Sequence, residues 1–176
     1  MSDRDFTALD REQLHAGHVF SVFAERFRFE DGEEVTRDVV RHPGAVAVVV
    51  LDDEGLYLVR QPRQAVGDPD VLELPAGRLD QDGEEPLETA KRELAEEIGK
   101  AAAHWEHLVS FWSSVGMTDE EVHVFLATDL SDAEADSGEN ERIEIVRRPL
   151  SEIDALIGEL RDAKTLIGLM ALQRRR

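Results

Sequence analysis

The chain has 176 residues, which at roughly 100–200 residues per domain predicts one main domain with a sizeable core. Its 39 acidic and 20 basic residues give a net charge of -19, so nucleic acid and anionic membrane surfaces would be repelled. The lack of cysteine excludes disulfides, a thiol nucleophile and cysteine-ligated metal centres. No apolar run reaches the roughly 18 residues of a membrane span and no signal-peptide pattern appears, so we expect a cytoplasmic, soluble protein.

The N-terminal region predicts a β extension. Residues 1–18 are polar and weakly patterned. From Val19 to Val40 apolar residues flank Asp31-Gly32, a dipeptide typical of hairpin turns. We therefore expect a β-hairpin there, with residues 1–42 forming an extension and residues 43–176 the main domain.

The main domain predicts a mixture of strands and helices. Residues 45–51 form a continuous apolar run, which favours a strand buried on both faces. Further strands are expected at 56–59, 71–74, 107–112, 122–128 and 143–147, and helices at 86–98, 152–161 and 163–172. Few helices separate many strands, which predicts an α+β fold or an αβα sandwich around a mixed sheet.

The helix expected at 86–98 gathers carboxylates on one face. Glu93, Glu96 and Glu97 lie together there, beside an apolar stripe. Like charges one turn apart repel, and burial at the edge of a core increases the repulsion. A hard divalent cation such as Mg²⁺ would remove this conflict, because it prefers carboxylate oxygens. The alternative is a solvated acidic helix face.

The residues around these glutamates resemble the Nudix box, G-x5-E-x7-R-E-U-x-E-E-x-G-U, in which U is a bulky aliphatic residue. The matching residues are Gly77, Glu84, Arg92, Glu93, Leu94, Glu96, Glu97 and Gly99. Two departures are present. Six residues instead of five separate Gly77 from Glu84, and Lys100 replaces the final aliphatic residue. The resemblance implies a Nudix αβα sandwich and hydrolysis of a nucleoside diphosphate linked to another moiety.

The same resemblance implies roles for individual residues. The cofactor would be Mg²⁺, with Mn²⁺ as an alternative. Glu93 and Glu97 would be the principal metal ligands, and Glu96 a further ligand or a supporting residue. The Ala76 carbonyl would be a backbone ligand, and Arg92 would orient the glutamates by charge-assisted hydrogen bonds.

Segments outside the box are similar to the ADP-ribose pyrophosphatase branch of the family. They are RDVVRHPGAVAVVV, VRQPRQ, ELPAG, SVGMTDE and DAKTLIGLM. This resemblance implies cleavage of ADP-ribose to AMP and ribose 5-phosphate, by a homodimer in which the N-terminal extension packs against the second subunit. Ser114-Val115-Gly116 departs from the Ser-Pro-Gly of many members of the branch.

The branch also implies substrate contacts and loop carboxylates. Arg37, Arg41, Arg60 and Arg63 stand where it handles phosphate and ribose, and Arg binds phosphate bidentately. Met117 and Glu120 are candidate ligand contacts in a following loop. In the acidic loop 131–141, Glu139 is the candidate base and Glu141 an added metal ligand. The alternatives are ordinary surface arginines and a solvated acidic loop.

Other functions stay open beside this hypothesis. The substrate could instead be GDP-mannose or a dinucleoside polyphosphate. A catalytically silent Nudix-like ligand sensor is an alternative from a second functional class. The presence of Arg92 and all three glutamates argues against it, because a binding module need not keep them. The six histidines form neither an HxH nor an HExxH pair, and no Gly-x-Ser-x-Gly or Walker A pattern occurs.

Overall fold

A computed structural model of the chain describes residues 4–81, 83–134 and 142–175. The chain divides into two compact units. The N-terminal unit holds the described residues up to Gly44 together with Trp112–Glu121, and the main unit holds Ala45–Phe111 and the described residues from Val122 onward. The sequence did not indicate that segment 112–121 would join the N-terminal strands, and the predicted domain boundary after residue 42 stays a prediction.

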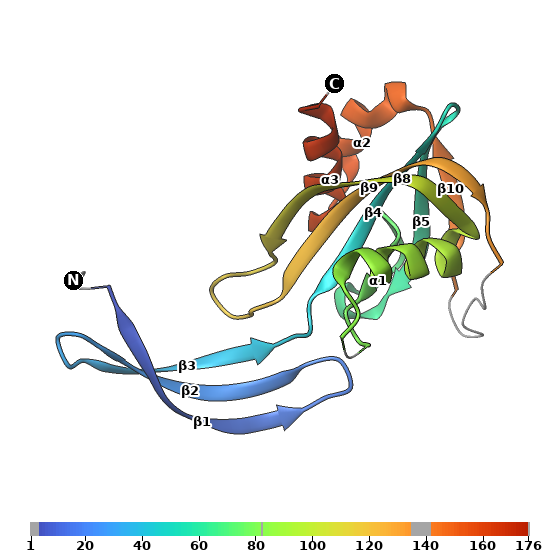
Figure 1. Ribbon diagram of the computed structural model, residues 1–176. Helices are drawn as coiled ribbons and strands as arrows, with labels where there is room; N and C mark the ends of the chain where they lie inside the picture. The colour runs from blue at the N-terminus through green and yellow to red at the C-terminus, as the bar shows by residue number, and fades with distance from the viewer. Residues whose placement is uncertain (1–3, 82, 135–141, 176) are drawn as a thin grey trace. The chain divides into compact units, whose positions relative to one another are not determined.

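The N-terminal unit contains a three-stranded antiparallel sheet in the order β1-β2-β3 (Figure 1). The strands are β1 (Phe6–Ala16), β2 (Ser21–Phe29) and β3 (Glu34–Arg41). The predicted hairpin is confirmed, and Gly32 adopts the positive φ of 89° that its turn requires. Strand β1 was not predicted, because its residues are almost all exposed and show no apolar alternation.

The main unit is built on a mixed sheet in the order β10-β5-β4-β9-β8, with β6 paired to β5 and β7 to β4. Strand β4 pairs with β9 in parallel and with β5 antiparallel. The strand bounds are β4 (Ala45–Asp52), β5 (Gly55–Arg63), β6 (Asp68–Glu73), β7 (Ala76–Arg78), β8 (Lys100–Trp112), β9 (Glu121–Asp132) and β10 (Glu144–Arg148). A 3₁₀ turn, η1 (Gln64–Val66), connects β5 to β6.

Helices cover both faces of this sheet. They are α1 (Pro86–Glu93), α2 (Ile153–Glu159) and α3 (Ala163–Gln173), with a 3₁₀ turn, η3 (Leu150–Glu152), before α2. Val46, Val48 and Val50 of β4 pack with Ala90 and Leu94 in one core cluster. Ala47 and Val49 join the other cluster, which includes side chains from α2 and α3. The predicted αβα sandwich and the strand buried on both faces are therefore confirmed.

The helix predicted at 86–98 is confirmed in extent but changes character along its length. Pro86 occupies the first helical turn, as expected. The last turn, η2 (Leu94–Ile98), is π-helical, a form that often marks functional sites. Gly99 ends it with φ 69°, and its N–H donates to the Ala95 carbonyl at 2.9 Å. None of the described helices is long and apolar enough to cross a membrane.

Candidate active site

Arg92 of α1 is the centre of a cluster of carboxylates in the main unit. Its Nη1 donates to Glu93 Oε1 at 2.8 Å and to Glu96 Oε2 at 3.2 Å. Its Nη2 lies 3.3 Å from Glu84 Oε2 and 3.4 Å from Asp80 Oδ1. These are the contacts predicted for Arg92 with the helix glutamates, joined by two acidic residues from the preceding loop. Its role in catalysis stays a prediction.

Glu84 closes the loop before α1 against the helix. Its Oε2 accepts hydrogen bonds from Arg92 and from the buried Thr89 hydroxyl, the latter at 2.8 Å. These hydrogen bonds hold the pKa of Glu84 below its ordinary value. Burial opposes the charge of Arg92, but Glu84, Glu93 and Glu96 outweigh it and raise the Arg92 pKa. Glu84 and Arg92 therefore stabilise each other's charged form.

Glu93 and Glu97 are both held against the β7 strand that enters the box. The side chain of Glu93 is 12% exposed and occupies the space that a Cβ on residue 77 would need, so a side chain there would displace the carboxylate. Glu97 is buried, and its Oε2 accepts the Ala76 N–H at 2.9 Å. The predicted backbone ligand Ala76 and the predicted carboxylate ligands are thus neighbours. Glu96 is the most exposed of the three glutamates, at 34% of its side chain.

The donor set fits a hard divalent cation, although the described residues do not form a preassembled metal cluster of three or more His, Asp or Glu side chains. Glu93, Glu96 and Glu97 supply carboxylate oxygens, the ligands that Mg²⁺ and Mn²⁺ prefer. The Nε atom of Arg92 is buried without a hydrogen-bond partner in the described part of the chain. Because Arg92 shares oxygens of Glu93 and Glu96, a bound cation would compete with it for them. The metal-ligand assignments stay predictions.

Arg63, at the end of β5, is anchored by a buried carboxylate. Its Nε and Nη2 bind the two oxygens of Glu73 at 2.6 and 2.7 Å. The side chain of Glu73 is only 2% exposed, whereas that of Arg63 is 40% exposed. Hydrogen bonds to Glu73 are the main cause of the raised pKa of Arg63, and the charge of Glu97 also contributes. Arg63 therefore presents a fixed cation within the electrostatic range of the box.

Arg60 lines a different hollow from Arg63. Its Nη1 binds Asp70 Oδ2 at 2.8 Å, and its Nε lies 3.9 Å from Glu144. It contributes to a 320 Å³ hollow, while Arg63 contributes to one of 540 Å³. The structure thus separates two arginines that the sequence grouped together, and a substrate role for either stays a prediction.

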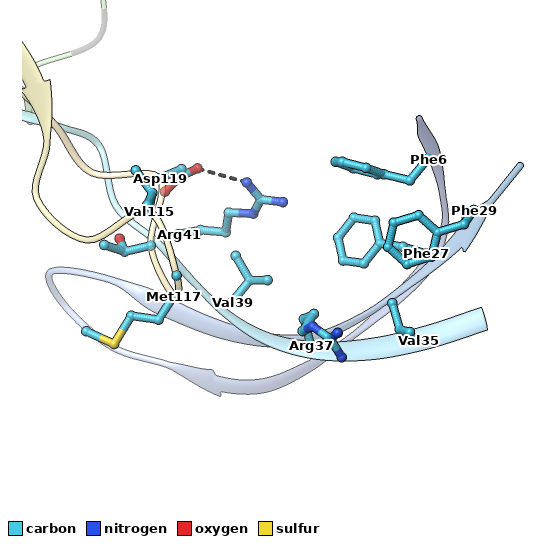
Figure 2. Close-up of a pocket in the computed structure, with 12 residues that line it drawn as sticks. Phe6, Phe27, Phe29, Val35, Arg37, Val39, Arg41, Val115, Met117 and Asp119 are labelled. Atoms are coloured by element: carbon cyan, nitrogen blue, oxygen red, sulfur yellow. Dashed lines mark hydrogen bonds and ion pairs between the residues drawn. The ribbon is translucent and has the colours of Figure 1, made fainter. Parts of the chain in front are cut away.

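Arg37 and Arg41 lie in the N-terminal unit, where both line a hollow of 490 Å³ (Figure 2). Arg41 binds both oxygens of buried Glu25, at 2.9 and 2.6 Å, and Asp119 at 3.0 Å. Hydrogen bonds to these two carboxylates raise the pKa of Arg41. Arg37 donates to the Thr36 carbonyl at 2.9 Å and has no carboxylate partner among the described residues.

Aromatic rings form one end of this hollow. Phe6 meets Phe27 edge to face with ring centroids 5.4 Å apart, and Phe29 lies 6.2 Å from Phe6. Met117 lines the opposite end and is 56% exposed. The hollow combines flat apolar surface with the guanidinium of Arg37, whereas Arg41 is already paired with two carboxylates. Aromatic rings beside a guanidinium suit an aromatic, phosphorylated ligand.

The remaining predicted site residues are in loops. Glu120 belongs to the N-terminal unit, and its Oε1 lies 3.6 Å from His42 Nδ1. A substrate contact for Glu120 and Met117 stays a prediction. Glu139 and Glu141 lie outside the described residues, so their predicted roles rest on the sequence alone.

In each of the two units, residues that contact predicted site residues were not singled out from the sequence. Asp80 belongs to the lengthened loop of the box and contacts Arg92. Glu73 stands between Leu72 and Leu74 in a buried strand end, and a carboxylate in such an apolar run signals a buried ion pair. Asp119 binds the His42 N–H and Arg41; burial opposes its charge, but these two contacts keep its pKa low.

Comparison with known proteins bears on this arrangement. The profile of the NUDIX domain family matches residues 41–167. The ADP-ribose pyrophosphatase of Mycobacterium tuberculosis is 38% identical over 98% of this chain and 85% of its own length. The ADP-ribose pyrophosphatase of Bacillus subtilis is 36% identical over 98% of this chain and 95% of its own length.

A solved structure shares the fold. The crystal structure of an ADP compounds hydrolase superposes with a TM-score of 0.87, covering 99% of this chain and 96% of its own. The two sequences are 23% identical. This likeness establishes the fold of the chain and places no residue of the site.

Proposed function

This chain belongs to the NUDIX family, and on that premise we propose that it hydrolyses the pyrophosphate bond of ADP-ribose or a related nucleoside diphosphate sugar. With ADP-ribose the products are AMP and ribose 5-phosphate. One observation carries the proposal. Glu93 and Glu97 are held beside Ala76 and Gly77 at the entrance of the box, with Arg92 bound to Glu93 and Glu96.

NUDIX hydrolases generally need a divalent metal, and Mg²⁺ is our choice for this chain. Glu93, Glu97 and the Ala76 carbonyl would hold it, with Glu96 as a further or supporting ligand. When bound, the metal neutralises negative charge that develops on the phosphoryl oxygens and favours ionisation of the attacking water. Arg92 restrains the glutamates on the protein side through its hydrogen bonds.

A glutamate of the acidic loop completes the reaction. Glu139 takes the proton of the water that attacks phosphorus, and Glu141 adds a ligand to the metal site. Since a base acts in the transition state, Glu139→Gln lowers kcat with little change in metal affinity. Glu141→Gln instead raises the Mg²⁺ concentration needed for half-maximal rate. Near-normal kinetics in both variants would assign the catalytic carboxylate elsewhere.

The substrate is held by cations and aromatic rings. Arg63 binds the pyrophosphate, supported by its fixed position on Glu73. Arg37, from the same or the partner subunit, binds the nucleotide in the hollow of the N-terminal unit. Two observations support this assignment: Arg37 has no carboxylate partner among the described residues, and the Phe6 ring lines the same hollow. Met117 and Arg41 line the same hollow.

The decisive experiment is a substrate panel. ADP-ribose, GDP-mannose and diadenosine polyphosphates are each assayed with Mg²⁺, with Mn²⁺ and with EDTA. We expect kcat/KM to favour ADP-ribose and all turnover to stop in EDTA. A kcat/KM more than about tenfold higher for another substrate would overturn the ADP-ribose assignment but leave the assignment as a hydrolase intact. Tight ADP-ribose binding without turnover would instead identify a ligand sensor.

A homodimer is part of the proposal. Among the described residues of the N-terminal unit, no hydrophobic side chain is buried, and Phe6, Leu14 and Phe20 are 62%, 54% and 43% exposed. A three-stranded sheet with such a surface gains stability by packing against a partner. Sedimentation analysis tests this state, and a monomer at micromolar concentration would refute it. A cytoplasmic location remains a proposal from the sequence.

A further inference from the structure

The first turn of α3 carries three polar residues to which the proposed function assigns no role. They are Asp162, Lys164 and Thr165, from the segment DAKTLIGLM. Asp162 caps the helix, because its Oδ2 accepts the Thr165 N–H at 3.0 Å. Its other oxygen, Oδ1, binds Lys164 Nζ at 2.9 Å. Asp162 therefore fixes both neighbours on the same helical turn.

Thr165 ties this turn to the strand end before the Nudix box. The residue is fully buried, and its Oγ1 donates to Asp162 Oδ2 at 2.5 Å. The same Oγ1 accepts the Leu74 N–H at 2.8 Å. Leu74 lies two residues before Ala76, whose N–H binds Glu97. The Thr165 hydroxyl thus fixes the main chain that presents the Ala76 carbonyl.

Lys164 ties the same turn to Arg63. Its Nζ contacts Glu73 Oε2, the oxygen that also accepts Arg63 Nη2. The side chain of Lys164 is 17% exposed. Charges alternate along the series Asp162, Lys164, Glu73 and Arg63, so each buried or half-buried charge has an opposite neighbour. Lys164 thereby limits the positions in which Glu73 can hold Arg63.

Packing alone would dock α3 on the sheet without these polar contacts. Leu169 and Leu172 are buried in the core, and a Cβ on Gly168 would lie 2.7 Å from the Leu74 Cδ1 atom. The helix therefore approaches Leu74 closely through apolar contacts. Buried ion pairs add little net stability relative to apolar packing, because desolvation offsets their attraction. The polar contacts of this turn instead fix the orientation of the main chain at Ala76 and of the Arg63 side chain.

We propose that Thr165 and Lys164 are positioning residues for the reaction, Thr165 acting on the Ala76 carbonyl and Lys164 acting through Glu73 on Arg63. This inference rests on the proposed function, in which Ala76 serves the metal and Arg63 serves the substrate. The proposal assigns metal binding to one residue and substrate binding to the other, whereas a purely structural helix contact would affect both together. Loss of the hydroxyl weakens metal binding, and loss of the ammonium weakens substrate binding.

The test uses the full-length protein and two readouts that need no turnover. Mn²⁺ binding is measured by electron paramagnetic resonance, and ADP-ribose binding by calorimetry in EDTA. The variants are Thr165→Val and Lys164→Met, with Thr165→Ser and Lys164→Arg as conservative counterparts. Lys91→Met is the matched control, because Lys91 forms an exposed pair with Glu88 on α1. If Thr165→Val does not fold, Thr165→Ala takes its place.

We expect Thr165→Val to weaken Mn²⁺ binding about tenfold and Thr165→Ser to restore it. Lys164→Met should weaken ADP-ribose binding about fivefold and raise KM with little change in kcat, and Lys164→Arg should restore most of the loss. If Thr165→Val and Lys164→Met change Mn²⁺ binding and ADP-ribose binding equally, or change neither, the positioning roles are overturned. Binding of both probes by the wild-type protein would still uphold the proposed function in that case. A wild-type protein that binds neither probe overturns both.

Discussion

The carboxyl group of Glu93 lies where a side chain at position 77 would have to stand. A Cβ built on Gly77 would be 1.9 Å from Glu93 Cδ and 2.0 Å from Oε1. The φ angle of Gly77 is not positive, so its backbone is accessible to other residues. Glycine is therefore required here for space, and the space is filled by a predicted metal ligand.

Gly77→Ala should displace the Glu93 carboxylate and lower kcat at least about 100-fold. Because the backbone conformation tolerates alanine, the melting temperature should change much less than the rate. Gly158→Ala is the matched control, since a Cβ there meets no atom within 4 Å and should leave kcat unchanged. If Gly77→Ala turns over substrate as fast as wild type at saturating Mg²⁺, the position of the Glu93 carboxylate is not important for catalysis.

Glu97→Gln separates the charge of this residue from its structural contact. Glutamine is the same size, and its Oε1 can still accept the Ala76 N–H, so the fold should survive. The negative charge is lost from a buried position beside the predicted metal ligands. We expect activity to fall by at least about 100-fold, measured at saturating Mg²⁺ on protein with a normal circular dichroism spectrum. A variant as active as wild type would remove Glu97 from the metal site.

Much of the main unit could be predicted because its signals are local. The apolar run at 45–51 became β4, and Pro86 and Gly99 bound the helical segment as expected. Helical spacing predicted that Glu93, Glu96 and Glu97 share one face, and the family resemblance predicted the contacts of Arg92 with glutamates there. Local patterns specify these elements because periodicity and terminal residues act within a few positions.

Other features depend on residues far apart in the chain. Strand β1 pairs with β2 through its backbone and has no apolar alternation, so no sequence pattern predicts it. Arg41 was grouped with substrate-binding arginines, yet its partners Glu25 and Asp119 lie 16 and 78 positions away. The π-helical turn at the end of the box likewise has no signature in residue spacing. Pairings over such distances are set by tertiary packing, which a single sequence does not display.

The buried ion pairs of Glu73 predict a pH dependence of stability. Burial alone would raise the pKa of Glu73, but Arg63 and Lys164 outweigh it and hold the pKa below its ordinary value. A lowered folded-state pKa contributes stability above the unfolded value, about 4.3, and that contribution is lost as pH falls through the folded pKa. Glu73→Gln should therefore be less stable at pH 7, by about 3 kcal/mol, and lose less stability on acidification.

Urea unfolding at pH 7 and at several acidic pH values measures this difference. Glu88→Gln is the comparison, because Glu88 forms an exposed pair with Lys91 and should change stability by less than about 1 kcal/mol. Parallel stability–pH curves for wild type and Glu73→Gln would contradict the prediction.

Arg41 and Arg37 line the same hollow but should respond differently to substitution. Arg41 neutralises Glu25, whose side chain is 5% exposed, whereas Arg37 has no carboxylate partner among the described residues. Arg41→Met leaves a buried charge uncompensated and should destabilise the N-terminal strands by about 3 kcal/mol, seen as faster hydrogen exchange in β2 and β3. Arg37→Met should leave exchange unchanged and raise KM for ADP-ribose about tenfold, through loss of a charge-assisted contact. Faster exchange in Arg37→Met with an unchanged KM would reverse the two assignments and make Arg37 the structural residue of the pair.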